Sequence, residues 1–336
     1  MKAKSAISRA FGGRIGWSSL GFAFSLLIVA VAGATLFRLF RNLEFGKVLG
    51  AIENFPLERL LAAGACVAGS YIALTFYDLF ALRTIGRRTI PYRVAAFASF
   101  TSYTIGHNFG ATIFTSGLVR LRIYSAWGLG VVDIAKIAFM TGLTYWLGNA
   151  FVLGSGLIYT PAAASLFNNM PDWSNRLIGI AALTTLAVYI GWLVPRPRLI
   201  GRANWRLTLP SAGATVIQIG IGTLDLCCVA LAMFTLLPNA PAIGFISFVV
   251  IFITAMLLGI ISHVPGSLGV IEAAVFIGMP QFPKEELLAS LLIFRLMNFV
   301  LPVTLAASLY GLRECWILFG GTVGDRDRDA CESRRS

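Results

Sequence analysis

The stretch Ile260–Glu272, which reads IISHVPGSLGVIE, interrupts an otherwise apolar region that runs from Ile243 to Met279. One proline and two glycines break the helical pattern, and a histidine and a glutamate lie beside the break. Inside a bilayer, irregular backbone is stable only where protein or a water-filled cavity satisfies its free N–H and C=O groups. The stretch therefore predicts a binding site, with helix breaks at Pro265, Gly266 and Gly269.

The composition indicates a polytopic membrane protein. Of the 336 residues, 57% are hydrophobic and 12% are charged, whereas soluble domains average about 25% charged residues. Because one membrane crossing needs some 20 apolar residues, the hydrophobic blocks predict about eight transmembrane helices. We expect an all-α protein with a single transmembrane domain over 18–312.

The net charge of +12 is concentrated in the short connections between hydrophobic blocks. This pattern favours the positive-inside rule over nucleic-acid binding as its explanation. It predicts that the N-terminus 1–17 and the basic connections 83–93 and 195–208 are cytoplasmic, and that 313–336 is a polar, disordered cytoplasmic tail. The five cysteines have neither zinc-site nor disulfide-framework spacing, so no metal or other cofactor is predicted.

The predicted crossings follow the hydrophobic blocks. They are 18–40, 59–82, 130–158, 177–195, 209–237, 242–262, 262–279 and 287–312. The polar segment 94–118 fits none of them, because counting from the basic connections places both of its ends on the cytoplasmic side. We therefore predict a broken, re-entrant segment there, interrupted at Gly106 and Gly110, and a second broken or re-entrant segment near 262–279.

The two predicted breaks share the pattern Ile-small-His-x-x-Gly, at 105–110 and 261–266. Interrupted hydrophobic segments at corresponding places in two halves are the strongest sequence indication of a transporter's midplane site. The pattern suggests an internal duplication. The distribution of charge does not establish whether the two halves would be inverted relative to each other. His107 and His263, the two histidines of the chain, are either hydrogen-bonded packing residues at kinks or members of a proton relay.

Four residues near the second break are candidates for headgroup binding: His263, Ser267, Glu272 and Arg295. Ser267 is predicted to cap a new helix whose first N–H groups bind phosphate or carboxylate. Glu272 either locks the bundle by pairing with an arginine such as Arg295, or serves as a cation, proton or amine site. Arg295 either snorkels to the interface or pairs with a lipid phosphate or with Glu272.

Charged residues near the first break have two interpretations each. Arg120 and Arg122 are either positive-inside anchors or a bidentate site for a phosphodiester. Asp133 and Lys136 lie three residues apart on one helix face, where mutual neutralisation is the favoured explanation.

Asp78 and Asp225 stand in apolar helices without a local partner. Each either faces a hydrated cavity or caps a half-helix, and both are candidate coupling or structural charges. The chain contains no His-Glu-x-x-His, Gly-x-Ser-x-Gly or phosphate-binding Gly-Lys-Ser/Thr motif, so enzymatic activity is not expected.

Two blocks of sequence resemble a known family. The first comprises Ser102–Gly110, Gly117–Tyr124 and Asp133–Lys136, and the second comprises Ser262–Glu272 and Phe294–Leu296. Together, over about 60–312, they resemble the lysylphosphatidylglycerol synthase/flippase transmembrane domain family, in particular its stand-alone inner-membrane branch.

The resemblance implies a multi-pass protein of the bacterial inner membrane. In two-domain members of the family, this region moves an aminoacylated phospholipid between leaflets. The resemblance also places His263, Pro265, Gly266, Gly269, Glu272 and Arg295 at family motif positions. Two departures stand out: Ser267 replaces the second glycine that usually follows the proline, and the aminoacyl-transferase domain is absent, so synthase activity is not expected.

The favoured functional prediction is a flippase-like protein that binds a phospholipid or lipid-linked headgroup and moves it between leaflets. Arg120, Arg122 and Arg295 would attract the phosphate, while Glu272 or Asp78 would take an amine or a coupled proton. A polar groove lowers the cost of desolvating the headgroup. Two alternatives are an accessory membrane subunit of a lipid-modifying or glycosyltransferase system, and a membrane enzyme that acts on lipid.

Overall fold

The computed structural model describes residues 44–109, 112–195, 198–201 and 207–318. Nearly all of this part of the chain is helical, which confirms the predicted all-α membrane architecture. Its strands are β1 (Leu199–Ile200) and β2 (Leu207–Thr208), which form a short antiparallel hairpin within the basic connection 195–208. The predicted crossing at 18–40 lies outside the described residues, as does most of the predicted tail.

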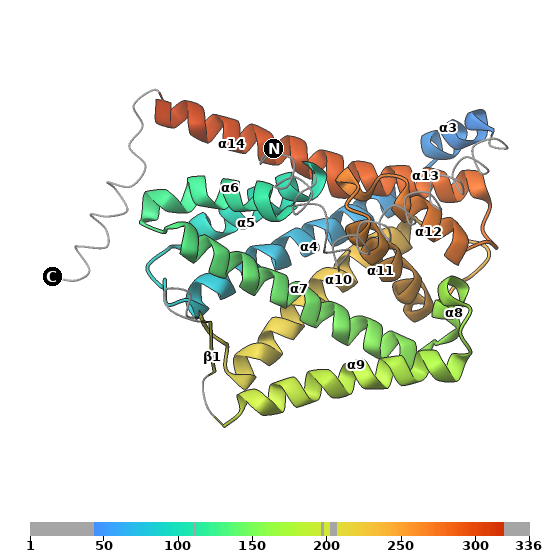
Figure 1. Ribbon diagram of the computed structural model, residues 1–336. Helices are drawn as coiled ribbons and strands as arrows, with labels where there is room; N and C mark the ends of the chain where they lie inside the picture. The colour runs from blue at the N-terminus through green and yellow to red at the C-terminus, as the bar shows by residue number, and fades with distance from the viewer. Residues whose placement is uncertain (1–43, 110–111, 196–197, 202–206, 319–336) are drawn as a thin grey trace, which may run out of the picture.

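Five helices in the described part are long and apolar enough to cross a membrane. They are α4 (Leu57–Thr84), α7 (Val131–Tyr159), α9 (Asp172–Leu193), α10 (Ala212–Leu236), and the continuous run of α13 (Lys284–Arg295), the π-helical turn η3 (Leu296–Val300) and α14 (Leu301–Leu318) (Figure 1). The chain is therefore a multi-pass membrane protein. The short helix α3 (Phe45–Glu53) precedes α4, and the short helices η1 (Ser125–Trp127) and α8 (Ala162–Asn168) lie between the long ones.

The two ends of the bundle differ in charge. Figure 1 shows the α4–α5 connection, β1 and the C-terminal end of α14 at one end, and α3 and α8 at the other. The first end carries both basic connections, so we refer to it as the basic end. The positive-inside rule predicts that the basic end faces the cytoplasm.

The first predicted re-entrant segment is a helical hairpin. Helices α5 (Tyr92–Phe109) and α6 (Thr112–Tyr124) lie side by side (Figure 1) and enter and leave at the basic end. There, Arg87 before the hairpin pairs with Asp133 after it at 2.8 Å. The prediction of a break at Gly106 is wrong, because α5 runs unbroken through this buried glycine. A glycine costs a helix only about 1 kcal/mol, less than losing backbone hydrogen bonds in an apolar environment. Gly110 lies outside the described residues.

The second break also forms a hairpin, which confirms the predicted broken, re-entrant segment near 262–279. The predicted crossings at 242–262 and 262–279 are wrong, because each is one arm of this hairpin. Helix α11 (Phe245–Ile261) leads into the 3₁₀ turn η2 (Pro265–Ser267), and α12 (Val270–Gly278) packs back along α11. Ile243 before α11 and Phe282 after α12 line one groove at the end opposite the basic end. The nine residues of α12 span only about 13 Å, less than half of the hydrocarbon core.

Four backbone positions with positive φ reverse the chain at this tip. They are His263, Gly266, Ser267 and Gly269, with φ of 55°, 60°, 51° and 81°. Glycine adopts this conformation at little cost, and Pro265 at the start of η2 prevents α11 from continuing. The motif seen in the sequence therefore encodes a reversal rather than a kink in a crossing helix.

The two hairpins enter from opposite ends of the bundle and meet at their tips. The turn η2 packs against α5, and a methyl group placed on Gly266 would lie 3.9 Å from the carbonyl oxygen of Asn108, near the end of α5. Both tips carry the Ile-small-His-x-x-Gly pattern. This is the spatial arrangement expected of an inverted repeat, although the duplication itself stays a prediction.

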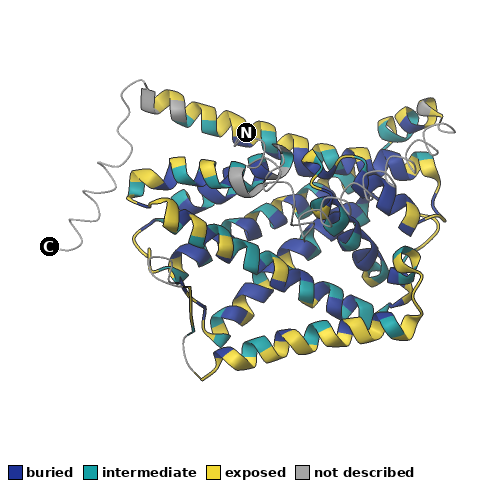
Figure 2. Cartoon of the chain, in the orientation of Figure 1, coloured by how far each residue is buried: buried dark blue, intermediate teal, exposed yellow. Residues whose placement is uncertain are grey.

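The hairpin helix α11 and the spanning helix α9 differ in how far they are buried. Figure 2 shows α11 largely buried, whereas α9 exposes most of its surface. Trp173 and Trp192, near the two ends of α9, are 66% and 47% exposed, as expected for aromatic residues at the two membrane–water interfaces. Glycines let α7 and α10 approach closely, since a methyl group on Gly148 would lie 2.8 Å from the Cα of Gly222.

Replacing Gly222 with alanine is expected to lower the free energy of unfolding by about 1–3 kcal/mol. The added methyl group would lie 2.6 Å from the Thr144 carbonyl oxygen of α7. The matched control is Gly220→Ala on the same helix, where nothing lies within 4 Å and alanine is the better helix former. Denaturation midpoints of both variants in detergent test this, and equal midpoints would contradict a close α7–α10 contact.

Candidate functional site

Arg295 holds the tip of the second hairpin. Its Nη1 donates to the Gly266 carbonyl oxygen at 2.9 Å, and its Nη2 donates to the Ser267 carbonyl oxygen at 3.1 Å. The same guanidinium donates to both Glu272 carboxylate oxygens, through Nε to Oε1 and through Nη2 to Oε2 at 2.8 Å. Glu272 in turn accepts from the Gly269 backbone N–H at 2.8 Å and so caps α12. One side chain thus satisfies backbone that the break leaves free and neutralises a buried carboxylate.

These contacts decide between the predictions for this region. Glu272, only 7% exposed, pairs with Arg295, which agrees with the interpretation that it locks the bundle by pairing with an arginine. Snorkelling by Arg295 is wrong, because its guanidinium binds inside the protein. The predicted cap at Ser267 is also wrong: Gly269 precedes the first residue of α12, and the Glu272 carboxylate supplies the cap. His263 is exposed, and its Nδ1 lies 2.8 Å from the Ile261 carbonyl oxygen of the same turn.

A second buried ion pair joins the first hairpin to α4. Arg120 of α6 donates to Asp78 through Nε at 3.0 Å and 3.2 Å and through Nη2 at 2.8 Å. The Tyr124 hydroxyl donates to the same carboxylate at 2.8 Å. Arg120 is 5% exposed and Asp78 is fully buried. Asp78 therefore neither faces a hydrated cavity nor caps a half-helix, and Arg120 is not an interfacial anchor.

The remaining charges near the first hairpin lie toward the basic end. Asp133 pairs with Arg87, so its predicted neutralisation by Lys136 is wrong, because a residue 46 positions away offers a better-placed cation. Arg122 is exposed on α6, and Lys136 is partly exposed on α7. The side chain of His107 lies outside the described residues.

The two buried pairs have a common role. Each pins the returning arm of one hairpin to a long helix, α6 to α4 through Arg120–Asp78 and α12 to α13 through Glu272–Arg295. The charges are reversed, since the returning arm contributes the cation in one hairpin and the anion in the other. These residues thus fix the hairpins in place.

A small cavity lies beside Asn108, near the tip of the first hairpin. Its volume is about 20 Å³, enough for one water molecule. The Asn298 Oδ1 atom of η3, which lines it, has no hydrogen-bond partner among the described residues. The lining comes from α4, α5, α10, α11 and η3, through Ser70, Tyr71, Leu74, Tyr103, Asn108, Val229, Met256, Asn298 and Phe299.

Asp225 is connected to this cavity through Ser70. Its carboxylate accepts from Ser70 Oγ at 2.5 Å and from the Tyr77 hydroxyl at 3.0 Å, and Ser70 also lines the cavity. Asp225 is 3% exposed and sits in the interior of α10, so it does not cap a half-helix. The sequence signalled an isolated carboxylate but gave no indication of its hydroxyl partners, which lie on another helix.

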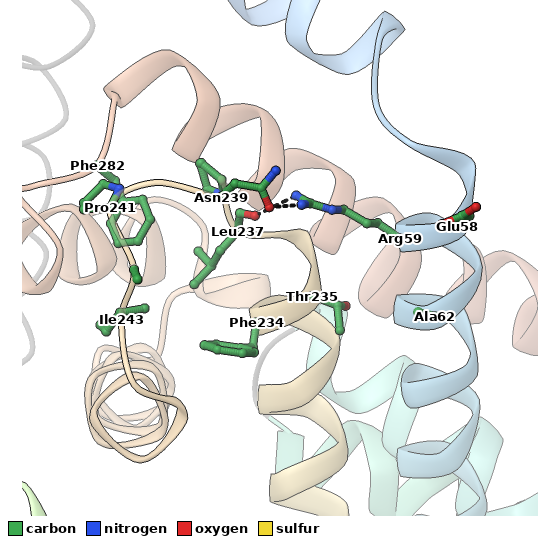
Figure 3. Close-up of a pocket in the computed structure, with 12 residues that line it drawn as sticks. Glu58, Arg59, Ala62, Phe234, Thr235, Leu237, Asn239, Pro241, Ile243 and Phe282 are labelled. Atoms are coloured by element: carbon green, nitrogen blue, oxygen red, sulfur yellow. Dashed lines mark hydrogen bonds between the residues drawn. The ribbon is translucent and has the colours of Figure 1, made fainter.

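Sequence reasoning missed a larger groove at the end opposite the basic end. This outer groove, of about 520 Å³, lies between the start of α4, the end of α10 and the segment before α11. Figure 3 shows Arg59 reaching across from α4, where it donates to the Leu237 carbonyl oxygen at 3.1 Å and to Asn239 Oδ1. The sequence signal that was available was the charged pair Glu58-Arg59 at the start of one hydrophobic block and the turn Pro238–Pro241 between two others. Among the described residues, no group of His, Cys, Asp and Glu suits a metal ion.

Comparison with known proteins supports the predicted resemblance. No protein-family model matches the chain. The chain is 29% identical to the uncharacterized protein slr0712 of Synechocystis over 80% of this chain and 83% of that protein. It is 26% identical to the Escherichia coli inner membrane protein YbhN over 82% of this chain and 86% of that protein.

Similarity also extends to phosphatidylglycerol lysyltransferase of Staphylococcus haemolyticus. The two are 25% identical over 87% of this chain, but the match covers only 34% of the lysyltransferase. The predicted resemblance to the lysylphosphatidylglycerol synthase/flippase transmembrane domain family is thereby confirmed.

Removing the guanidinium by Arg295→Gln is expected to destabilise the protein by about 3–5 kcal/mol, because Glu272 is left buried without a counter-charge. The matched control is Arg87→Gln, which also breaks an ion pair, but one whose arginine side chain is 47% exposed. Its expected cost is below about 1 kcal/mol. Unfolding in detergent measures both, and similar costs would contradict a structural role for Arg295.

A double-mutant cycle tests the pair itself. Glu272→Gln and Arg295→Gln each leave the partner's charge buried without a counter-charge. The double variant is therefore expected to lose less free energy of unfolding than the two single variants lose in sum. Strict additivity would show that the two side chains do not interact.

Proposed function

We propose that the protein binds the polar headgroup of a membrane phospholipid or other lipid-linked molecule and moves it between leaflets. One observation carries the proposal: two re-entrant hairpins from opposite ends pack against each other, and a small buried cavity with polar groups from Asn108 and Asn298 lies beside the end of α5. Interrupted helices that meet in this way build the central sites of many transporters. Similarity to an inner membrane protein and to part of a phosphatidylglycerol lysyltransferase supports the proposal.

The cavity supplies groups that replace water around a headgroup. Moving a polar headgroup through hydrocarbon is costly because its hydrogen bonds to water are lost. Asn108 and Asn298 offer amide groups, and Tyr71 and Tyr103 offer hydroxyl-bearing rings from two further positions around the cavity. Acyl chains remain in the lipid, and no covalent bond changes.

The outer groove suits the headgroup at the end opposite the basic end. Its walls are mostly apolar, with Phe234, Ile243 and Phe282 among them, while Glu58 and Arg59 supply charge (Figure 3). A guanidinium binds a phosphate through charge-assisted hydrogen bonds, and a neighbouring carboxylate attracts an amine. The groove therefore matches a zwitterionic or anionic phospholipid better than a fully apolar molecule.

Transport requires the hairpin tips to separate, because the closed cavity has room for one water only. The two buried ion pairs keep each returning arm attached to a long helix, so the arms move together with these helices. The π-helical turn η3 directly follows Arg295 and lines the cavity. Such turns mark functional hinges in helices, and we assign the bending point to η3.

Asn298→Leu tests the central cavity without an obvious cost in stability. The leucine removes a buried oxygen that has no partner among the described residues, so the unfolding midpoint should not fall. Loss of this polar group from the path is expected to slow exchange of headgroup-labelled phospholipid between liposome leaflets by about tenfold. Unchanged exchange would contradict passage through this cavity.

Arg59→Ala tests the outer groove. We expect weaker binding and slower exchange of anionic phospholipid, because the guanidinium no longer meets the phosphate. The control is Lys47→Ala, which removes a largely exposed cation from an ion pair near the same end of the molecule. Equal effects of both variants would indicate non-specific attraction of anionic lipid.

The wild-type protein in the same liposomes separates the candidate functions. Leaflet exchange above that of protein-free vesicles supports the proposal. Its absence for all common phospholipids, together with a co-purifying enzyme, favours an accessory subunit. New lipid species detected by mass spectrometry would indicate an enzyme.

A further inference from the structure

Asp225 is a buried carboxylate for which the described residues provide no cation. Asp78 is neutralised by Arg120 and Glu272 by Arg295, but Asp225 accepts only from two hydroxyls. An ionised carboxylate without a counter-charge is costly inside a membrane protein, and such residues commonly mark ion or proton pathways. Asp225 therefore requires an explanation beyond packing.

The surroundings of Asp225 favour a proton over a metal ion. Each carboxylate oxygen already accepts a hydroxyl, whereas hard cations need six or more oxygen ligands. The titratable groups that face it in the described part of the chain are phenols and thiols without formal charge. They come from α4, α5, α7 and α10: Tyr71, Tyr77, Tyr103, Tyr145, Cys228 and, beside Cys228, Cys66.

Three polar residues and one glycine form a row on one face of α10 between the basic end and Asp225. Thr215, Gln218, Gly222 and Asp225 follow at spacings of three and four residues and so share one helix face. Thr215 and Gln218 are fully buried, and ten residues of helix separate Thr215 from Asp225 by about 15 Å. The Gln218 Nε2 donates to Thr144 Oγ1 of α7 at 2.7 Å.

Three buried oxygens of α10 have no hydrogen-bond partner among the described residues. They are Thr215 Oγ1 and Gln218 Oε1 in this row, and Thr223 Oγ1 beside it. Asn298 Oδ1 of η3 is likewise without a partner in the described part of the chain. Buried polar atoms of this kind are usually satisfied by internal water, so Thr215 and Gln218 provide sites for internal water between the basic end and Asp225.

The row continues beyond Asp225 into the central cavity. Ser70 donates to Asp225 and also lines the cavity, and Val229, one turn beyond Asp225 on α10, lines it as well. Asp225 thus lies between a polar path from the basic end and the central cavity.

We propose that Asp225 is the proton-binding residue that couples lipid movement to a proton gradient. The carboxylate takes a proton from water that enters along Thr215 and Gln218, and becomes a neutral carboxylic acid. When the hairpin tips separate, the acid returns the proton to water in the central cavity and becomes a carboxylate again. This inference rests on the proposed function for the cargo, but not for the binding of the proton.

The experiment uses the full chain in liposomes with an imposed pH gradient. For one proton moved per lipid, a gradient of one pH unit shifts the steady-state distribution of labelled lipid between leaflets by up to about tenfold. We expect this shift in the wild type and its loss in Asp225→Asn, which still exchanges lipid without a gradient. Asp133→Asn, at the partly exposed surface pair, should respond like the wild type.

A second variant keeps the proposal testable if Asp225→Asn does not fold, and infrared spectroscopy adds a readout that does not depend on lipid exchange. Thr215→Val removes one buried oxygen that has no partner among the described residues and changes the side-chain volume little, so it should fold, weaken the response to the gradient and slow protonation of Asp225. Infrared difference spectra between acid and alkaline buffer should show a carboxylic C=O band that Asp225→Asn lacks.

The two readouts distinguish failure of this inference from failure of the proposed function. Wild-type lipid exchange that ignores the pH gradient overturns the coupling, as does a gradient response that survives in Asp225→Asn. A response to sodium in place of protons also overturns it. An infrared band of Asp225 in a protein that exchanges no lipid would support the proton site and refute the lipid as its cargo.

Discussion

The requirement that interrupted backbone find hydrogen-bond partners within the protein organises this structure. The reversal at 262–269 frees carbonyl groups at a depth where lipid offers no donor, and the Arg295 guanidinium supplies donors to Gly266 and Ser267 while it neutralises Glu272. A lysine has no planar fork with which to make this set of contacts. The hairpin, the capped start of α12 and the junction with α5 all depend on that one side chain.

The same solution occurs in the other hairpin with its charges exchanged. Arg120 on the returning arm meets Asp78 on α4, and Glu272 on the returning arm meets Arg295 at the end of α13. Two arms that enter from opposite ends are thus each attached to a long helix at depth. This leaves the contact between the tips, formed by the end of α5 and η2, free of ion pairs among the described residues. In the proposed transport, separation of the tips would break packing rather than a salt bridge.

Because the buried ion pairs hold the hairpins in place, other residues are the candidates for contact with the lipid in the proposed transport. The charges that first suggested headgroup binding are largely committed to each other, so polar uncharged groups such as Asn108 and Asn298 line the central cavity. Arg59 and Glu58 provide charge at the outer groove instead. Asp225 differs from the other buried carboxylates because hydroxyl groups are its partners. A protein that uses its ion pairs for architecture can keep one unpaired carboxylate for protons.

The sequence by itself determined the membrane class, the positions of the long helices, the re-entrant nature of 94–118 and the location of the second break, because hydrophobic length, basic connections and proline–glycine pairs act locally. It did not determine that 262–279 returns to the side from which α11 enters, since a short apolar segment reads alike whether it crosses or reverses. Nor did it reveal that Asp78 meets Arg120, or that Asp133 meets Arg87 rather than Lys136. Those pairs join residues 42 and 46 positions apart, so only the packing of helices decides them, and a charge pattern along one helix carries no information about its neighbours.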